Sequence, residues 1–406
     1  MPSRRTRRIR FERLESRQLL AGQVLVTVMN GDLVITGDTG DNSIEIAVQS
    51  PGQFQVSGRS GTEIVTSGDP HATTALVTGI TRDVLIDLKD GNDTAVLHPD
   101  ANTPIANAVI PQLSPRHVSV RVGSGANSVT IENGTIPGSL AIGRDTGTTV
   151  AQGNNISLVG LTVQGDVSIA QQQGPLHIGL AKDQILGRLS VQSSGDAARV
   201  AMRQVNVGKE ADLLLGIDNA ANQPDRVAIS GSKFGHRLNI HTGGGDDVVR
   251  IGQDGAVTAA IDAVFASTAD DALDGRVDIA NSLYVTTRGG ADEVLLANVG
   301  VGIAAIVDTG AGDDTIRIQQ IAVGNALNIN GGDGNNHVAI NGISAKNLTV
   351  LLGNGNDDIS ISRASIAKSV NVNGGAGVNH SSVSENHFPR RRWGIFRRTN
   401  FSNFRR

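Results

Sequence analysis

The sequence predicts an all-β protein, a parallel β-helix (solenoid) with rungs of about 22 residues, which we expect to be right-handed. A short apolar-x-apolar strand recurs at a nearly constant spacing, and glycine-rich turns recur between the strands. The composition agrees, because Gly, Asn, Asp, Thr and Ser are abundant while only eight Phe, one Tyr and one Trp occur in 406 residues. Such residues suit short strands joined by tight turns.

The recurrence of the strand is the strongest of these signals. A spacing this steady indicates stacked units instead of independent domains. The recurring strands begin at Val118, Leu140, Val167, Leu189, Leu213, Leu238, Ile261, Leu283, Ala305, Leu327, Leu348 and Val370, at steps of 22, 27, 22, 24, 25, 23, 22, 22, 22, 21 and 22 residues.

One unit, residues 327–347, shows the expected order of a rung: a strand, a turn at 331–336, a second strand and a third short segment. Alternation places Leu327, Ile329, Val338 and Ile340 on one side, as in half-buried strands. An outer-membrane barrel is the rival fold. It needs strands of about 9–11 residues and girdles of aromatic residues, whereas these strands span about four to six residues.

The charge divides the chain unevenly. Seven Arg and two Glu lie in residues 1–20, and seven Arg and one Glu lie in residues 385–406, so 21 basic and 36 acidic residues remain between them. We therefore divide the chain into a basic N-terminal export element (1–22), an irregular cap or widened rungs (23–117), regular β-helix repeats (118–384) and a basic aromatic tail (385–406).

The turns carry the main candidate site. A Gly-x-Gly-x-Asp pattern recurs in residues 242–250, 309–317 and 352–360. In these turns the chain resembles the haemolysin-type nonapeptide repeat. That resemblance implies Ca²⁺ bound between rungs by aspartate. The aspartate position falls at Asp247, Asp271, Glu293, Asp314, Asn336, Asp357 and Asn379, with outliers at Asn42, Asp93 and Asn127.

Calcium needs six to eight oxygen ligands, and carboxylates stacked one rung apart would repel one another without a cation. The alternative is plain turn geometry, because Gly, Asn and Asp tolerate the left-handed backbone that tight turns require. Calcium is therefore the expected cofactor only under the first interpretation. Its candidate ligands are Asp246, Asp247, Asp271, Asp313, Asp314, Asp357 and Asp358.

The N-terminus suggests a location. Leu14-Glu15-Ser16-Arg17-Gln18-Leu19-Leu20 resembles the Leu-Glu-Pro-Arg-x-Leu-Leu element of secreted or surface-exposed bacterial repeat proteins, with Ser16 in place of Pro. The resemblance implies export to the cell surface or medium. The alternative is a basic arm that binds nucleic acid or anionic lipid.

The C-terminal segment interleaves seven Arg with Phe388, Trp393, Phe396, Phe401 and Phe404. Such a segment can bind an anionic envelope component or a polysaccharide, or it can be a tail without a partner. We expect no sequence-specific nucleic-acid binding. We also expect no transmembrane segment, because no apolar run approaches about 18–20 residues.

Catalytic motifs are absent from the sequence. No Cys occurs, so disulfides and thiolate chemistry are excluded, and no His-Glu-x-x-His, Gly-x-Ser-x-Gly or phosphate-loop motif is present. We expect a non-catalytic secreted or cell-surface protein with an envelope, adhesion or matrix role. The alternatives are a carbohydrate-active β-helix enzyme, a lyase or hydrolase with paired carboxylates, and an intracellular acidic scaffold.

Overall fold

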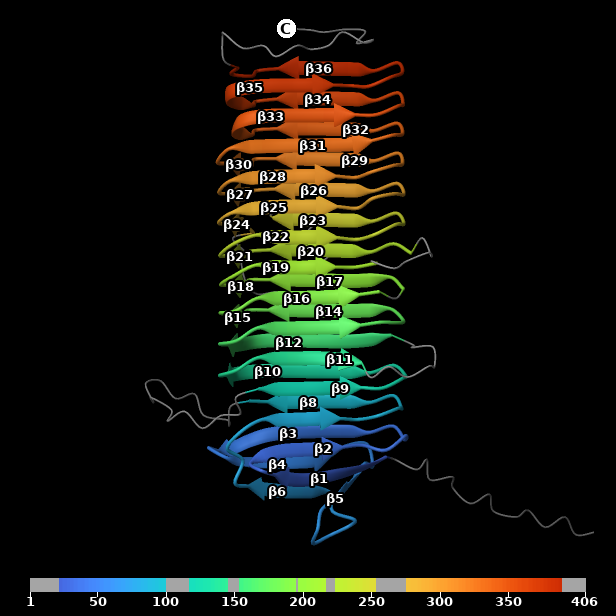
Figure 1. Ribbon diagram of the computed structural model, residues 1–406, viewed down its shortest axis with the longest axis vertical. Coiled ribbons are helices and arrows are strands. Elements are labelled where there is room, and N and C mark those ends of the chain that lie inside the picture. Colours follow the sequence, from blue (N-terminus) through green and yellow to red (C-terminus); the bar gives the residue numbers. More distant parts are fainter. Residues whose placement is uncertain are drawn as a thin grey trace, which may run out of the picture.

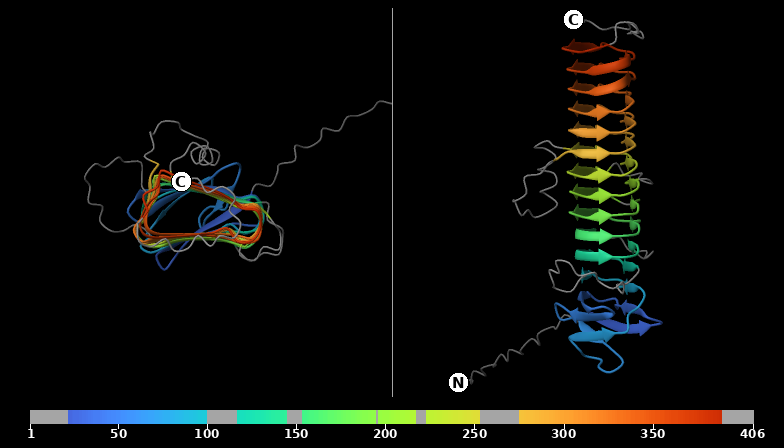
Figure 2. Two further views of the ribbon diagram at one scale, coloured as in Figure 1. Left: turned by 90° about the horizontal axis from the view of Figure 1, so that it is seen from above. Right: turned by 90° about the vertical axis from the view of Figure 1, so that its left-hand side faces the viewer.

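The computed structural model describes residues 22–99, 117–144, 153–194, 196–216, 223–252 and 275–388. These residues form 36 strands in one continuous, mostly parallel sheet that coils into a rod, and they contain no helix (Figures 1 and 2). The predicted all-β parallel β-helix is confirmed. The described part of the chain accordingly has no helix long and apolar enough to cross a membrane.

Each regular rung has a first long face, a second long face that runs back, and a short third face. Figure 2 shows the flattened cross-section that results, viewed along the rod. The first face consists of β7 (Val84–Asp87), β9 (Val118–Val122), β11 (Leu140–Arg144), β13 (Val167–Gln171), β16 (Leu189–Ser193), β19 (Ala211–Leu214), β22 (Leu238–His241), β25 (Ser282–Thr286), β28 (Ala304–Asp308), β31 (Ala326–Gly332) and the ends of β33 (Ser344–Leu352) and β35 (Ser365–Asn373).

The second face stacks in the same way. It consists of β8 (Thr94–His98), β10 (Ser128–Ile136), β12 (Asn154–Val163), β14 (Leu176–Ala181), β17 (Ala198–Arg203), β20 (Arg226–Ser230), β23 (Val248–Gly252), β26 (Glu293–Ala297), β29 (Thr315–Gln319), β32 (His337–Asn341), β34 (Asp358–Ser362) and β36 (His380–Ser384).

The third face is made of two- and three-residue strands together with the C-terminal residues of β10 and β12 and the N-terminal residues of β33 and β35. Figure 1 shows these short strands along one edge of the rod and the glycine-rich turns along the opposite edge. The short strands are β15 (Gln184–Ile185), β18 (Asn206–Val207), β21 (Lys233–Phe234), β24 (Val277–Ile279), β27 (Val299–Val301) and β30 (Ala322–Val323).

The strand pairing corrects two details of the predicted repeat. Leu189 pairs with Ala211, and Leu213 pairs with Val191, so the strand begins two residues before Leu213. Leu238 pairs directly with Leu283, so no rung lies between these strands. The predicted strand at Ile261 falls in residues 253–274, outside the described residues. The first error arose because Ala211 and Leu213 are both buried apolar residues, so an apolar triplet alone does not fix where the strand begins.

The interior is a column of aliphatic side chains. Leu327, Ile329, Val338 and Ile340 are each at most 1% exposed, as the alternation predicts. Phe54 and Phe234 are the largest fully buried side chains of the described residues. Burial of each such side chain contributes about 1.5–3 kcal/mol, so the stacked core is the main source of stability.

The N-terminal end is closed by antiparallel strands. They are β1 (Gln23–Met29), β2 (Asp32–Thr36), β3 (Ser43–Ser50), β4 (Gln53–Gly58), β5 (Glu63–Val65) and β6 (Thr74–Thr78). β1 pairs antiparallel with β2, and β4 pairs antiparallel with β3 and β6. β2 and β3 also pair in parallel with β7 and β8, so the cap leads directly into the rungs. Such a cap removes one open sheet edge.

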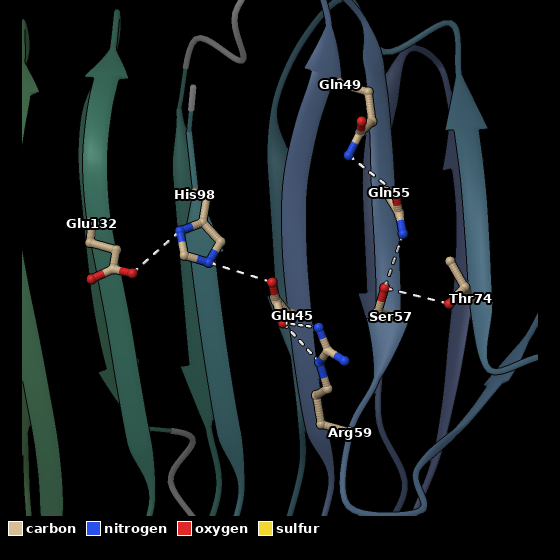
Figure 3. A network of polar contacts seen from close by, with 8 residues as sticks. All are labelled: Glu45, Gln49, Gln55, Ser57, Arg59, Thr74, His98 and Glu132. Carbon is tan, nitrogen blue, oxygen red and sulfur yellow. Dashed lines mark hydrogen bonds and ion pairs between the residues drawn. The ribbon is translucent and has the colours of Figure 1, made fainter. Parts of the chain in front are cut away.

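Polar side chains join this cap to the first rungs (Figure 3). His98 of β8 lies between Glu45 of β3 and Glu132 of β10, with nitrogen–oxygen distances of 3.6 and 3.5 Å. Arg59 donates from Nε to the same Glu45 at 2.8 Å. Strand β3 of the cap and the next two strands, β8 and β10 of the second face, are therefore linked on their outer side as well as through the core.

Candidate functional site

The candidate site is the edge of the rod where the first face turns into the second. Glycine is required there by stacking. Gly245, Gly312 and Gly334 have φ of 123°, 145° and 124°, which other residues rarely adopt. A Cβ on Gly312 would lie 1.7 Å from the carbonyl oxygen of Gly290 in the preceding rung. The recurring Gly-x-Gly is thus explained by close backbone contact between rungs.

Two residues after the last glycine, a buried Asn or Asp occurs in most rungs. We call this set the inner ladder: Asn42, Asp93, Asn127, Asn154, Asp225, Asp247, Asp292, Asp314, Asn336, Asp357 and Asn379. The backbone N–H of one member donates to the side-chain Oδ1 of the member in the next rung. For Asp247 to Asp292, Asp292 to Asp314 and Asp314 to Asn336 the distances are 2.8, 2.9 and 3.0 Å.

The preceding position forms an exposed outer ladder of opposite direction: Asp41, Asn92, Asp246, Asp313, Asn335 and Asn356. Here the backbone N–H of the later rung donates to Oδ1 of the earlier rung, at 2.8 Å for Ala291 to Asp246 and 2.7 Å for Asn335 to Asp313. Successive backbone N–H groups point in opposite directions along the rod. The inner-ladder side chain therefore accepts a hydrogen bond from the preceding rung, and the adjacent outer-ladder side chain accepts one from the following rung.

The seven predicted ligands therefore separate into different environments. Asp247, Asp314 and Asp357 belong to the inner ladder, and Asp246 and Asp313 belong to the outer ladder. Asp358 is the first residue of β34 and pairs with His337 at 3.2 Å. Asp271 lies outside the described residues.

The structure also changes the membership that the sequence predicts. Asp292, not Glu293, occupies the ladder, because Glu293 pairs with Val248 as the first residue of β26 and contacts Arg250. Asn154 and Asp225 were missed. Gly153 precedes Asn154, but Asp225 follows Pro224 without a Gly-x-Gly sequence, so only the pairing register could locate it.

Asn and Asp use the ladder position differently. In Asn336 the side-chain Nδ2 donates to the carbonyl oxygens of Gly332 and Gly334 at 3.1 and 3.3 Å, closing its own turn. In Asp225, Asp314 and four other ladder or corner aspartates, the second carboxyl oxygen Oδ2 is buried without a hydrogen-bond partner. A buried oxygen of this kind carries a desolvation cost that an amide at the same place avoids.

Burial accordingly raises the pKa of the ladder aspartates. The pKa of Asp93 and Asp225 is raised to about 7, and that of Asp247 and Asp314 to about 6. The neighbouring carboxyl of Asp292 raises the last two further. The hydroxyls of Thr242 and Thr309 act in the opposite direction on these two pKa values, although neither makes a well-directed hydrogen bond to Oδ2. The aspartates of the ladder therefore hold their protons to a higher pH than exposed aspartates do.

One oxygen of each inner-ladder carboxyl, Oδ1, is already engaged, which leaves Oδ2 as the oxygen that a calcium ion could use. Oδ1 of each inner-ladder aspartate already accepts a backbone N–H, and Asp246 and Asp247 direct Oδ1 to opposite rungs. Over the described residues no three His, Asp or Glu side chains are grouped so that they could hold a metal ion. Calcium would need six to eight oxygens around one point, and calcium binding stays a prediction that the melting experiment below tests.

Comparisons with known proteins add no relative. No protein-family model matches the chain, and neither a curated protein nor a solved structure matches it.

The raised pKa values predict that the protein is most stable in acid. The unfolded aspartates ionise near their usual pKa of 3.8, whereas the folded ones keep their protons to about pH 6–7. Their stabilisation is therefore complete below pH 4 and is lost as the pH rises through 6–7. We expect the melting temperature, followed by circular dichroism, to fall between pH 5 and pH 8.

Asp314→Asn tests the origin of this effect, because Asn at this position is expected to close the turn as Asn336 does. It should raise stability at pH 7.5 by about 1 kcal/mol and flatten the pH dependence. Asp313→Asn, on the exposed outer ladder, is the matched control and should change both much less, because the charge of Asp313 is the smallest of the causes that act on the pKa of Asp314. A lower melting temperature for Asp314→Asn at pH 7.5 would show that the ladder needs an anion.

Calcium is tested by the same melting experiment at pH 7.5. Because the aspartates do not converge, we expect the melting temperature to be the same in millimolar Ca²⁺ and in chelator. A bound ion stabilises the folded state by mass action. A rise of several degrees with Ca²⁺, abolished by Asp247→Asn, would instead restore the aspartates as ligands.

Proposed function

We propose that the chain is a non-catalytic, secreted or cell-surface β-solenoid rod with an envelope, adhesion or matrix role. The observation that carries this proposal is the uniformity of the site. The acidic positions recur from rung to rung, and Oδ1 of Asp246, Asp292, Asp313 and Asp314 each accepts a hydrogen bond from a backbone N–H. Catalytic sites are singular constellations, whereas this arrangement does the same structural task at every level.

The paired carboxylates do not support an acid/base pair. In Asp246–Asp247 and Asp313–Asp314 one carboxyl is buried in the inner ladder and the other is exposed in the outer ladder. A glycosidase needs two carboxyls that flank one substrate bond from opposite sides. The alternative of a carbohydrate-active enzyme therefore has no candidate pair among these residues.

The rod itself is suited to a spacer or surface role. Thirteen strands, from β3 to β36, follow one another along the second face, which at about 4.8 Å per rung gives a length of roughly 60 Å. The hydrogen bonds that join its rungs need no cofactor. The proposal of export depends on the N-terminal element, which lies outside the described residues.

Cell fractionation with N-terminal sequencing of the native protein tests this proposal. We expect the protein in the surface or secreted fraction, with the N-terminal element removed. An uncleaved cytoplasmic protein would contradict export and favour the intracellular scaffold. Incubation with acidic polysaccharides provides the second arm, in which sustained release of unsaturated or reducing ends would contradict a non-catalytic role.

A further inference from the structure

A shallow groove of about 1050 Å³ follows the third face along the rod. It spans eight rungs, from β15 to the beginning of β35, on the edge opposite the glycine turns (Figure 1). Phe234 and Ile279 lie buried beneath it, while Gly302, Ala322 and Gly324 form part of its floor. The groove is thus an elongated concave surface parallel to the rod axis.

Close contact between neighbouring rungs restricts the floor of this groove to residues without a side chain at Gly302 and Gly324. A Cβ on Gly302 or Gly324 would lie 2.0 or 1.9 Å from a carbonyl oxygen of the preceding rung. A Cβ on Gly300 would meet Asp278 Oδ1 at 2.6 Å and Arg276 Nη2 at 2.8 Å, so the ion pair of these two residues crosses the groove above Gly300. These contacts belong to the folded backbone, and the groove is therefore preformed.

The basic residues of this edge distinguish it from the acidic turns. Four of the six lysines of the chain, Lys209, Lys233, Lys346 and Lys368, lie on the third face or at its corner with the first face, and all four are exposed. In the described part of the chain none of the four makes an ion pair. Three acids of this edge or its corner with the first face pair with an arginine: Glu210 with Arg188, Asp212 with Arg237 and Asp278 with Arg276. A fourth, Asp166, accepts the backbone N–H of Arg188.

The lysines are concentrated at the two ends of the groove. Lys209 and Lys233 lie on neighbouring rungs at one end, and Lys346 and Lys368 lie on neighbouring rungs at the other. Lys233 and Lys346 line the groove itself. Four rung steps separate them, from β21 through β24, β27 and β30 to β33, or about 19 Å. An extended anionic chain that lies along the groove would therefore meet a positive charge at both ends.

We propose that this groove binds a linear anionic polysaccharide, aligned with the rod, through Lys209 and Lys233 at one end and Lys346 and Lys368 at the other. This rests on the proposed function, since such polymers are envelope and matrix components. Charge complementarity supports it: the polymer is attracted to unpaired lysines and repelled by the acidic turns on the opposite edge. Exposed Leu186 adds apolar surface for the sugar rings.

The chemistry of the lining residues favours a polysaccharide over single-stranded nucleic acid. Nucleic-acid grooves stack bases on exposed aromatic rings, and the one aromatic lining residue, Phe234, is 1% exposed. Because charge supplies the attraction, we expect the affinity to fall steeply as salt is added.

The test uses the full chain, so that the basic terminal segments are the same in every protein. Polygalacturonate is titrated calorimetrically into wild type, the double variant Lys233→Ser/Lys346→Ser, and the control Arg121→Ser/Arg317→Ser, which removes two exposed charges from the long faces. We expect the lysine variant to bind about tenfold more weakly with a smaller salt dependence. The control should bind as the wild type does, and neutral dextran should not bind.

The proposal would be overturned if the lysine variant bound polygalacturonate as tightly as the wild type, or if the control lost as much affinity as the lysine variant. It would also be overturned if poly(dT) or anionic vesicles bound more tightly than polygalacturonate and lost affinity in the same way on Lys233→Ser/Lys346→Ser. Circular dichroism of each variant establishes that it is folded. If the lysine variant and the wild type bind equally, the groove assignment fails but the proposed surface location is unaffected. If the protein is cytoplasmic and uncleaved but still binds polygalacturonate, the proposed function fails and the groove assignment stands.

Discussion

The structure depends on the stacking of polar backbone from one rung onto the next at the glycine turns. In a parallel β-helix the strands satisfy their own hydrogen bonds, but the turns must find partners along the rod. Here the N–H of Asp247, Asp292 and Asp314 each donates to the side chain one rung ahead. The outer ladder returns bonds in the opposite direction, as from Ala291 to Asp246. Within the described residues these turns are thus tied to the turns on both sides, which keeps their rungs in register.

This constraint also explains the unusual acidity of the middle of the chain. Asp and Asn serve one geometric purpose on the inner ladder because both offer Oδ1 to the neighbouring rung. The Asp rungs then hold a second oxygen that burial deprives of water, and burial raises its pKa. The repeated carboxylates are therefore explained by stacking, and the surface that we propose for a partner is the lysine-bearing third face on the opposite edge.

The sequence was sufficient to predict the coil because its 22-residue period and its alternation follow directly from stacking. It was insufficient where register decides. Leu213 and Ala211 are both apolar, and only pairing with Leu189 and Val191 shows which begins the strand. Glu293 and Asp292 are adjacent acids, of which only Asp292 has an N–H opposite Asp314. The groove could not be predicted, because its lysines come from rungs far apart in the chain and its floor follows from backbone contacts.

The central claim is that cross-rung hydrogen bonds hold the glycine turns, and amide hydrogen exchange measured residue by residue tests it most directly. The amides of Asp247, Asp292, Asp314 and Asn336 lie in turns but donate to buried oxygens of the next rung. The account predicts that they exchange as slowly as the amide of Ile316 within strand β29. Exchange as fast as that of Gly68, in the loop between β5 and β6, would contradict it.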